Sequence, residues 1–109
     1  MKPIEFLGDS LDRIRAFSQQ ARRQAGFQLD RVQRGLDPDD WKSMPTVGPG
    51  VREIRVRDAT GAYRVMYVAN LPNAVFVLHA FQKKTQRTSP RDLALAQTRF
   101  RSLSRGGPP

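Results

Sequence analysis

The side chains best suited to chemistry in this sequence are cations at alternating positions of a predicted strand. The segment VREIRVR, residues 51–57, alternates apolar and charged residues, as expected of a strand with one covered face. Arg55 and Arg57 would then point the same way, about 7 Å apart, an interval close to that of successive RNA phosphates. Glu53 shares their face and could orient an arginine or accept a proton. The alternative is an exposed strand face that is merely charged.

Further candidates come from the two apolar segments that follow. Arg64 lies in AYRVMYVA, where an unpaired buried charge is costly. It therefore either joins the other arginines on the open face or pairs with Glu53. His79, near the end of AVFVLHAF, is either a structural residue or a participant in proton transfer, because its pKa is ordinarily near neutral. Lys83 and Lys84 come directly after this run. Arg52 and Arg87 are further candidates for RNA contact. Phe81 is a candidate for stacking on a base.

The residue inventory excludes most familiar active sites. The chain has no cysteine and one histidine, which excludes thiolate metal sites, two-histidine ribonuclease sites and HExxH zinc sites. It also lacks a Walker A loop, a GxSxG motif and a carboxylate cluster fit for two metals. One reaction fits the remaining equipment. In metal-free RNA cleavage the substrate's own 2′-hydroxyl is the nucleophile, so the protein only moves protons and stabilises charge. We therefore expect no metal and no cofactor.

The charge distribution favours a polyanionic partner. Residues 1–50 carry 8 basic and 7 acidic side chains, whereas residues 51–109 carry 11 basic and 3 acidic ones. Nearly all of the net charge of +9 therefore lies in the second half. Most of the cations are arginines, whose planar fork matches phosphate geometry. No apolar run approaches the roughly 20 residues that a membrane span needs, and the N-terminus turns acidic after a few apolar residues, unlike a secretory signal. We expect a cytoplasmic protein without membrane association.

Periodicity predicts an α+β domain over residues 1–103, followed by a disordered tail over 104–109. A short strand at 3–7 precedes two helices, the second at 19–35, that form either a hairpin hinged near Phe17-Ser18 or one kinked helix. The apolar stripe of the second helix is Ala21, Ala25, Leu29, Val32 and Leu36. Residues 37–50 are rich in Pro and Gly and predict an ordered loop that Trp41 anchors to the core.

Three strands and a helix complete the predicted order. The strands are expected at 51–57, 62–69 and 74–81, and the last is apolar on both faces, as in a central covered strand. Strict alternation would place Val75, Val77, His79 and Phe81 on one face. Ser89 caps a final helix with Pro90 at its first position. The expected architecture is a helical hairpin packed on a mostly antiparallel sheet whose other face is at least partly open.

The segments GVREIRVRD, GAYRVMYVA and AVFVLHAFQKKTQRTSPRDLALAQTRF together resemble the RelE/HigB-type toxins of bacterial toxin–antitoxin modules, in particular a phage-derived branch. The likeness covers roughly residues 5–103 and is strongest over 50–100. It implies a RelE-like fold, messenger RNA cleavage in the ribosomal decoding site, and neutralisation by an antitoxin, often of helix-turn-helix type. The partners expected are therefore this antitoxin, the ribosome and mRNA.

The resemblance also implies roles for individual residues. Arg55 and Arg57 match basic residues of the first long hairpin strand, and Arg64 matches a "YR" arginine that stabilises the transition state. Lys83 and Lys84 match the basic pair that closes the last strand. Some members use a tyrosine in the C-terminal helix, but residues 90–103 contain none. The general base and acid therefore stay open among Lys83, Lys84, His79 and Glu53.

Two other functions compete with the nuclease. ParE-type toxins resemble the same scaffold and act on DNA gyrase. A non-catalytic nucleic-acid-binding or phage regulatory protein could use the same basic face. The density of cations on the hairpin favours RNA over gyrase, and only an activity measurement separates a nuclease from a binding protein.

Overall fold

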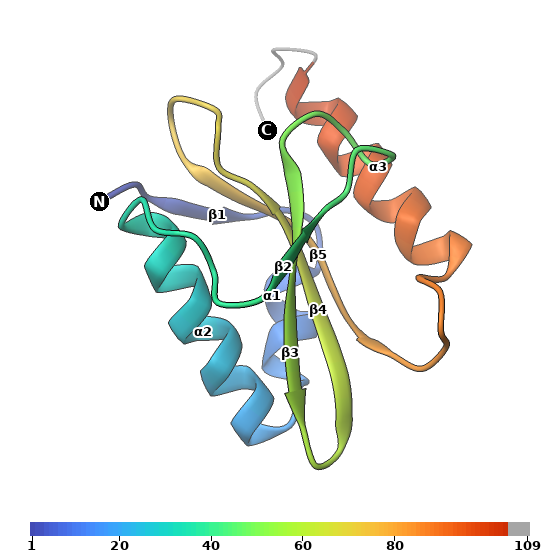
Figure 1. Ribbon diagram of the computed structural model, residues 1–109. Coiled ribbons are helices and arrows are strands. Elements are labelled where there is room, and N and C mark those ends of the chain that lie inside the picture. Colours follow the sequence, from blue (N-terminus) through green and yellow to red (C-terminus); the bar gives the residue numbers. More distant parts are fainter. Residues whose placement is uncertain (105–109) are drawn as a thin grey trace.

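The computed structural model describes residues 1–104 and contains three helices and five strands (Figure 1). In chain order they are β1 (Ile4–Phe6), α1 (Ser10–Arg15), α2 (Gln19–Gln33), β2 (Trp41–Ser43), β3 (Val51–Asp58), β4 (Gly61–Val68), β5 (Val75–Lys83) and α3 (Pro90–Ser104). The predicted helices and the four predicted strands are all present, with ends displaced by a few residues. The predicted tail begins at Ser104, which α3 includes, and the rest of it lies outside the described residues.

The five strands form one mixed sheet in the order β1-β5-β4-β3-β2. All neighbours are antiparallel except β1, which runs parallel to β5. The two long hairpin strands, β3 and β4, are paired without interruption from Val51↔Val68 to Asp58↔Gly61. The α+β class and the mostly antiparallel sheet are confirmed, and the arrangement is consistent with a RelE-like fold.

Helices cover both faces of the sheet, so the chain has two apolar clusters. On one face, α1 and α2 pack against β3, β4 and β5. On the opposite face, α3 and the segment around Met44 and Val47 cover one end of the same strands. The two helical layers are seen on opposite sides of the strands (Figure 1). The second face is therefore partly covered, and its uncovered end lies toward the β3–β4 turn.

Local sequence signals explain where the helices begin and end. Ser18 caps α2 by accepting from the Ala21 amide at 3.1 Å, and Ser89 caps α3 by accepting from Asp92 N at 3.1 Å. At the end of α2, the amide of Gly35 donates to Val32 O and that of Leu36 donates to Arg31 O. These two bonds form a Schellman motif, for which Gly35 supplies the required positive φ of 84°.

The structure corrects three expectations. The Pro- and Gly-rich segment 37–50 is more than a loop, because it contains β2, which pairs with β3 at the sheet edge. Leu36 is 50% exposed and does not continue the buried stripe of α2, since the helix has already ended. The third correction concerns β5, which contains an irregularity opposite Met66/Tyr67.

This irregularity changes which side chains of β5 share a face. His79 is paired with Met66, whereas Val77 is paired with Tyr67, so Leu78 is an extra residue and the strand bulges. Val75 and Val77 consequently pack with the α1–α2 side, whereas His79 bonds to α3. The expectation that Val77 and His79 share a face is therefore wrong. Within residues 1–104, no helix is long and apolar enough to span a membrane.

Candidate nucleic-acid interface

The strand register gathers most of the predicted site residues on one face of the sheet. Two adjacent rows cross β3, β4 and β5: Arg55, Arg64 and Phe81 form one row, and Arg57, Ala62 and Lys83 form the next. Register partners point to the same side, and strands lie about 4.8 Å apart. Arg55, Arg64 and Lys83 therefore lie on one face, which is the face that α3 covers only in part. Figure 1 shows the β3–β4 hairpin reaching well past the end of α3. We call this uncovered end the basic face.

A buried carboxylate lies at the base of the two central arginines. The Glu53 side chain is 3% exposed, and its Oε1 lies 3.5 Å from Arg64 Nε and 3.9 Å from Arg55 Nε. Arg64 is itself only 8% exposed, whereas Arg55 is 36% exposed. Both alternatives for Arg64 therefore hold together, because it shares the face of Arg55 and also pairs with Glu53. The carboxylate offsets the repulsion between two guanidiniums that lie directly opposite each other.

Hydrogen bonding in this cluster is incomplete. In the described part of the chain, the buried side-chain N and O atoms that lack a hydrogen-bond partner are Glu53 Oε2, Arg55 Nε and Arg64 Nε. Leaving a buried polar atom unpaired typically costs about 1–3 kcal/mol, and more when the group is charged. All three such atoms belong to one contiguous group. The protein therefore concentrates unsatisfied donors and an unsatisfied acceptor on the basic face.

Opposing electrostatic effects act on the Arg64 cation. Burial lowers the pKa of the Arg64 guanidinium, Glu53 raises it, and the neighbouring Arg55 and Arg57 lower it further. The charged guanidinium of Arg64 is therefore partly desolvated and lies beside other cations. Such an environment strengthens its attraction to an incoming anion, because a partly desolvated charge interacts over a lower effective dielectric.

A small cavity opens beside these arginines at the free edge of β3. It has a volume of about 230 Å³ and is lined by Gln24, Asp40, Arg55, Val56, Arg57 and Arg64. The pairing of β3 with β2 ends at Ile54, opposite Trp41. The next residue of β3, Arg55, donates its amide to Asp40 O at 2.9 Å. Beyond that point, Gln24 Nε2 donates to Arg57 O at 3.3 Å. Three guanidinium groups therefore border one opening at the edge of the sheet.

The lysine pair and Arg87 lie at the end of β5 and in the connection that follows it. Lys83 is half-buried as the last residue of β5, whereas Lys84 and Arg87 are exposed in the connection to α3. Thr85 Oγ1 donates to Arg87 O at 2.5 Å within that connection. Phe81 is 5% exposed, so its ring offers little surface for base stacking and instead packs beside Arg64. Among these cations, Lys83 is the one that the strand register places on the face of Arg55 and Arg64.

His79 is enclosed between the sheet and α3. Its side chain has no exposed surface, Nε2 lies 2.6 Å from Asp92 Oδ1, and Nδ1 lies 3.4 Å from Arg99 Nη1. Burial lowers the pKa of His79, and the hydrogen bond with Asp92 opposes this shift. A neutral ring that donates from Nε2 to Asp92 and accepts at Nδ1 from Arg99 satisfies both contacts. The His79 ring also stacks on Phe81 at 5.4 Å, so it supports the row that contains Arg64.

One predicted site residue lies on the other face of the sheet, and one residue that was not predicted joins the basic face. Arg52 is three positions from Arg55 and so lies on the opposite face, where it donates to Asp37 at 2.8 Å and covers the Trp41 ring at 3.8 Å. Lys42 of β2 is the register partner of Glu53 and adds an exposed cation to the basic face. Sequence reasoning missed Lys42 because a three-residue edge strand leaves no periodicity. In residues 1–104, no group of three or more His, Cys, Asp or Glu is placed to hold a metal ion.

Comparison with known families identifies the family of the chain. A family model described as phage-derived protein Gp49-like (DUF891) matches residues 12–101. The chain belongs to the Gp49-like family. This family is known as RelE/HigB-like toxins, so the resemblance to toxin–antitoxin toxins is confirmed at that level. No curated protein sequence matches the chain significantly.

The match places the basic face within the family's shared region. Residues 12–101 of this Gp49-like chain include β3, β4, β5 and the connection to α3, and hence all nine predicted site residues. The family is compatible with a toxin and implies an antitoxin partner. The roles of the individual side chains stay predictions.

Proposed function

We propose that this Gp49-like protein is the toxin of a toxin–antitoxin module and cleaves messenger RNA on the ribosome without a metal ion. The observation that carries the proposal is the clustering of the unsatisfied atoms Glu53 Oε2, Arg55 Nε and Arg64 Nε on the basic face. A ribose-phosphate linkage offers both anionic oxygens, which accept from guanidinium groups, and a hydroxyl, which donates. DNA offers the acceptors but lacks the 2′-hydroxyl. The donor and acceptor pattern of the cluster therefore favours RNA.

In the proposed reaction, the 2′-oxygen forms a bond to the adjacent phosphorus while the bond to the leaving 5′-oxygen breaks. The 2′-hydroxyl loses its proton to a base, and the 5′-oxygen gains one from an acid. Arg55, which is 36% exposed, and Arg64, which lies directly opposite it on the same face, stabilise the negative charge that builds up on the pentavalent phosphorus. The products are a 2′,3′-cyclic phosphate and a 5′-hydroxyl.

The remaining residues take supporting roles in this proposal. Glu53 orients the two arginines, and Lys83 and Lys84 at the end of β5 are the candidates for moving protons. His79 has no exposed surface, so we assign it a positioning role through its stack on Phe81. Exposed cations around the cluster would hold flanking phosphates: Lys42, Arg57 and Arg87.

The test is cleavage of a defined message in a reconstituted translation system, read by primer extension. The wild-type protein should cut messages that ribosomes are translating and leave the same free message intact. Arg55→Glu should greatly reduce cutting and lower the salt dependence of RNA binding by about 0.7–0.9 in slope for each phosphate that the variant no longer binds. Arg23→Glu reverses the charge of an exposed arginine on α2 and should leave both measurements unchanged.

Other outcomes would assign a different function. Protein that binds RNA but leaves translated messages intact would be a non-catalytic nucleic-acid-binding protein. Arrest of DNA synthesis before protein synthesis in pulse-labelled cells would indicate a gyrase-directed toxin. Either result would overturn the nuclease proposal.

A further inference from the structure

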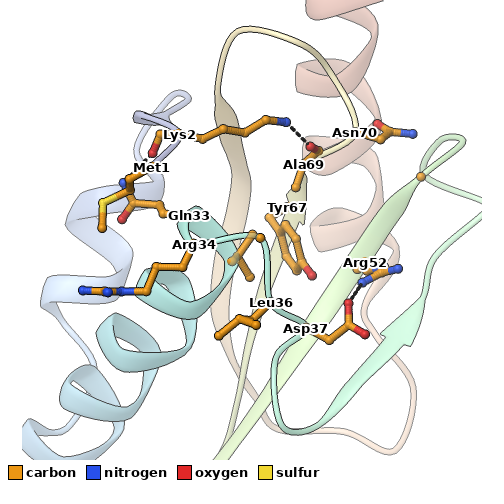
Figure 2. A pocket seen from close by; sticks show the side chains of 13 residues that line it. Met1, Lys2, Gln33, Arg34, Leu36, Asp37, Arg52, Tyr67, Ala69 and Asn70 are labelled. Carbon is orange, nitrogen blue, oxygen red and sulfur yellow. Dashed lines mark hydrogen bonds and ion pairs between the residues drawn. The ribbon is translucent and has the colours of Figure 1, made fainter.

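A second concavity lies on the face of the sheet opposite the basic face. It has a volume of about 750 Å³, within the usual range of ligand-binding clefts. Its walls are the C-terminal end of α2, the following turn, and the ends of β3 and β4. Figure 2 shows Leu36 and Tyr67 around this hollow, with the Arg34 guanidinium pointing away from it and Lys2 reaching across to the Ala69 carbonyl. We call it the α2 groove.

The groove is a built feature held by specific hydrogen bonds. The Lys2 amide donates to Gln33 O at 3.0 Å, and Gln33 Nε2 donates back to Lys2 O at 2.9 Å. Lys2 Nζ also donates to the carbonyls of Ala69 and Leu71, the latter at 2.7 Å. These bonds tie the start of the chain to the end of α2 and to the β4–β5 turn. One end of the groove is therefore fixed in shape.

An apolar side chain stands uncovered inside it. In a Schellman motif, the residue at the position of Leu36 commonly packs back onto its own helix. Here Leu36 is 50% exposed and lines the groove beside Val32 and Ala69. The floor thus offers aliphatic contact to a ligand without any rearrangement.

The charges that border the groove are mainly positive. Its lining contains the cations Lys2, Arg34 and Arg52 and one carboxylate, Asp37. The Lys2 ammonium group donates to two backbone carbonyl oxygens. Carbonyl oxygens carry no net charge, so neither contact neutralises the ammonium. The Arg34 guanidinium is bonded to Asp30 on α2 and points away from the hollow, and Arg52 is paired with Asp37, so the excess positive charge at the groove rests on Lys2 (Figure 2). An acidic ligand is therefore favoured over a neutral or basic one.

The groove is poorly suited to nucleic acid. Tyr67 is its one aromatic lining residue, and that side chain is 1% exposed. A single-stranded base needs an open ring face on which to stack, and this groove provides none. An aliphatic side chain from a peptide would meet Leu36 directly.

We infer that the α2 groove is a docking site for an acidic peptide segment of the protein's partner that inserts an apolar side chain beside Leu36. Naming that partner as the antitoxin rests on the proposed function, whereas the peptide chemistry does not. Arg52 and Arg55 lie three residues apart on β3 and so point to opposite faces. A partner seated in the α2 groove therefore need not touch the basic face.

The inference is tested with a fluorescein-labelled synthetic peptide of alternating Glu and Leu and a matched peptide of Lys and Leu. Fluorescence polarisation should show binding of the acidic peptide to the full chain and weaker binding of the basic one. Leu36→Glu should weaken the acidic peptide about tenfold or more, equivalent to 1.4 kcal/mol or more. Phe27→Glu is the matched control, because Phe27 is a similarly exposed apolar residue, at 57%, on α2 outside the groove lining. It should bind the acidic peptide as the wild type does.

Four results would overturn the inference. The acidic peptide could fail to bind, or it could bind equally well to both variants. Single-stranded RNA could displace the peptide at the same RNA concentrations at which the RNA itself binds the protein. That result would assign the groove to nucleic acid. Sedimentation could show that the wild type self-associates and Leu36→Glu does not, which would assign the groove to a second copy. Because Leu36→Glu leaves the basic face intact, message cleavage by this variant tests the nuclease separately.

Discussion

Replacing Arg64 with alanine tests the basic face most directly, because this side chain is central to the cluster. If Arg64 stabilises the charge that develops on phosphorus, its loss should lower kcat by about 10²–10³-fold, the usual effect of removing one such donor. Arg64→Lys keeps the charge but not the planar fork, so it should recover part of the activity.

The same substitution has a calculable effect on stability. Removing one partner of a buried ion pair costs about 3–5 kcal/mol in well-paired cases. Here the distance between Arg64 Nε and Glu53 Oε1 is 3.5 Å, which is longer than in a well-paired case. In the variant, Glu53 keeps its contact with Arg55 at 3.9 Å, and the repulsion between Arg55 and Arg64 disappears. We therefore expect a smaller loss in the free energy of unfolding, about 1–2 kcal/mol, against a typical total of about 5–15 kcal/mol. The variant should remain folded.

The assay pairs message cleavage in a translation system with urea unfolding followed by circular dichroism. Arg23→Ala, which truncates an exposed arginine of α2, should match the wild type in both measurements. A folded Arg64→Ala variant that cuts translated messages within a few-fold of the wild-type rate would refute the role assigned to Arg64. An unfolded variant would instead refute the stability estimate, and Arg64→Lys would then carry the catalytic test.

Two further predictions concern stability. Gly48→Ala should destabilise the fold by about 1–3 kcal/mol, because the new Cβ would lie 2.4 Å from the Phe100 ring. In Gly26→Ala, the new Cβ on α2 has no atom within 4 Å, so this variant should be more stable by about 0.5–1 kcal/mol. If urea titrations gave the two variants the same free energy of unfolding, the packing at Phe100 would be contradicted. Burial lowers the pKa of His79 against the opposing effect of Asp92, so its contribution to stability is present above the ordinary pKa of 6.5 and is lost as pH falls below it. The wild type should therefore lose more free energy of unfolding than His79→Gln on acidification below this pKa, and identical losses would exclude His79 as the cause.

Much of the site was accessible from the sequence because strand periodicity is local. Arg55 and Arg57 share a face whenever VREIRVR is a strand, and the same alternation puts Arg52 on the other side. The predicted RNA contact by Arg52 overlooked this consequence of the spacing. The caps at Ser18 and Ser89 are equally local, since each serine bonds to a backbone amide three residues away.

The features that escaped prediction depend on contacts between distant segments. β2 is three residues long and is a strand because β3 offers it an edge, which also brings Lys42 beside Glu53. The bulge in β5 arises from its register with β4, and it turns His79 toward Asp92 of α3. The burial of Glu53 likewise could not be derived from alternation alone. Alternation places Glu53 on the same face as Arg55 and Arg57, and a face with three charged residues is expected to be exposed.

For this protein, the order of residues alone determined the α+β class, the helix caps and the alternation that aligns its arginines, because each depends on neighbours within a few positions along one chain segment. Pairing of distant strands decided the rest: which arginine faces which, that a carboxylate is buried beneath them, and that the histidine is enclosed. Register and burial are properties of two or more segments in contact, and one segment's residues do not specify the partner against which it packs.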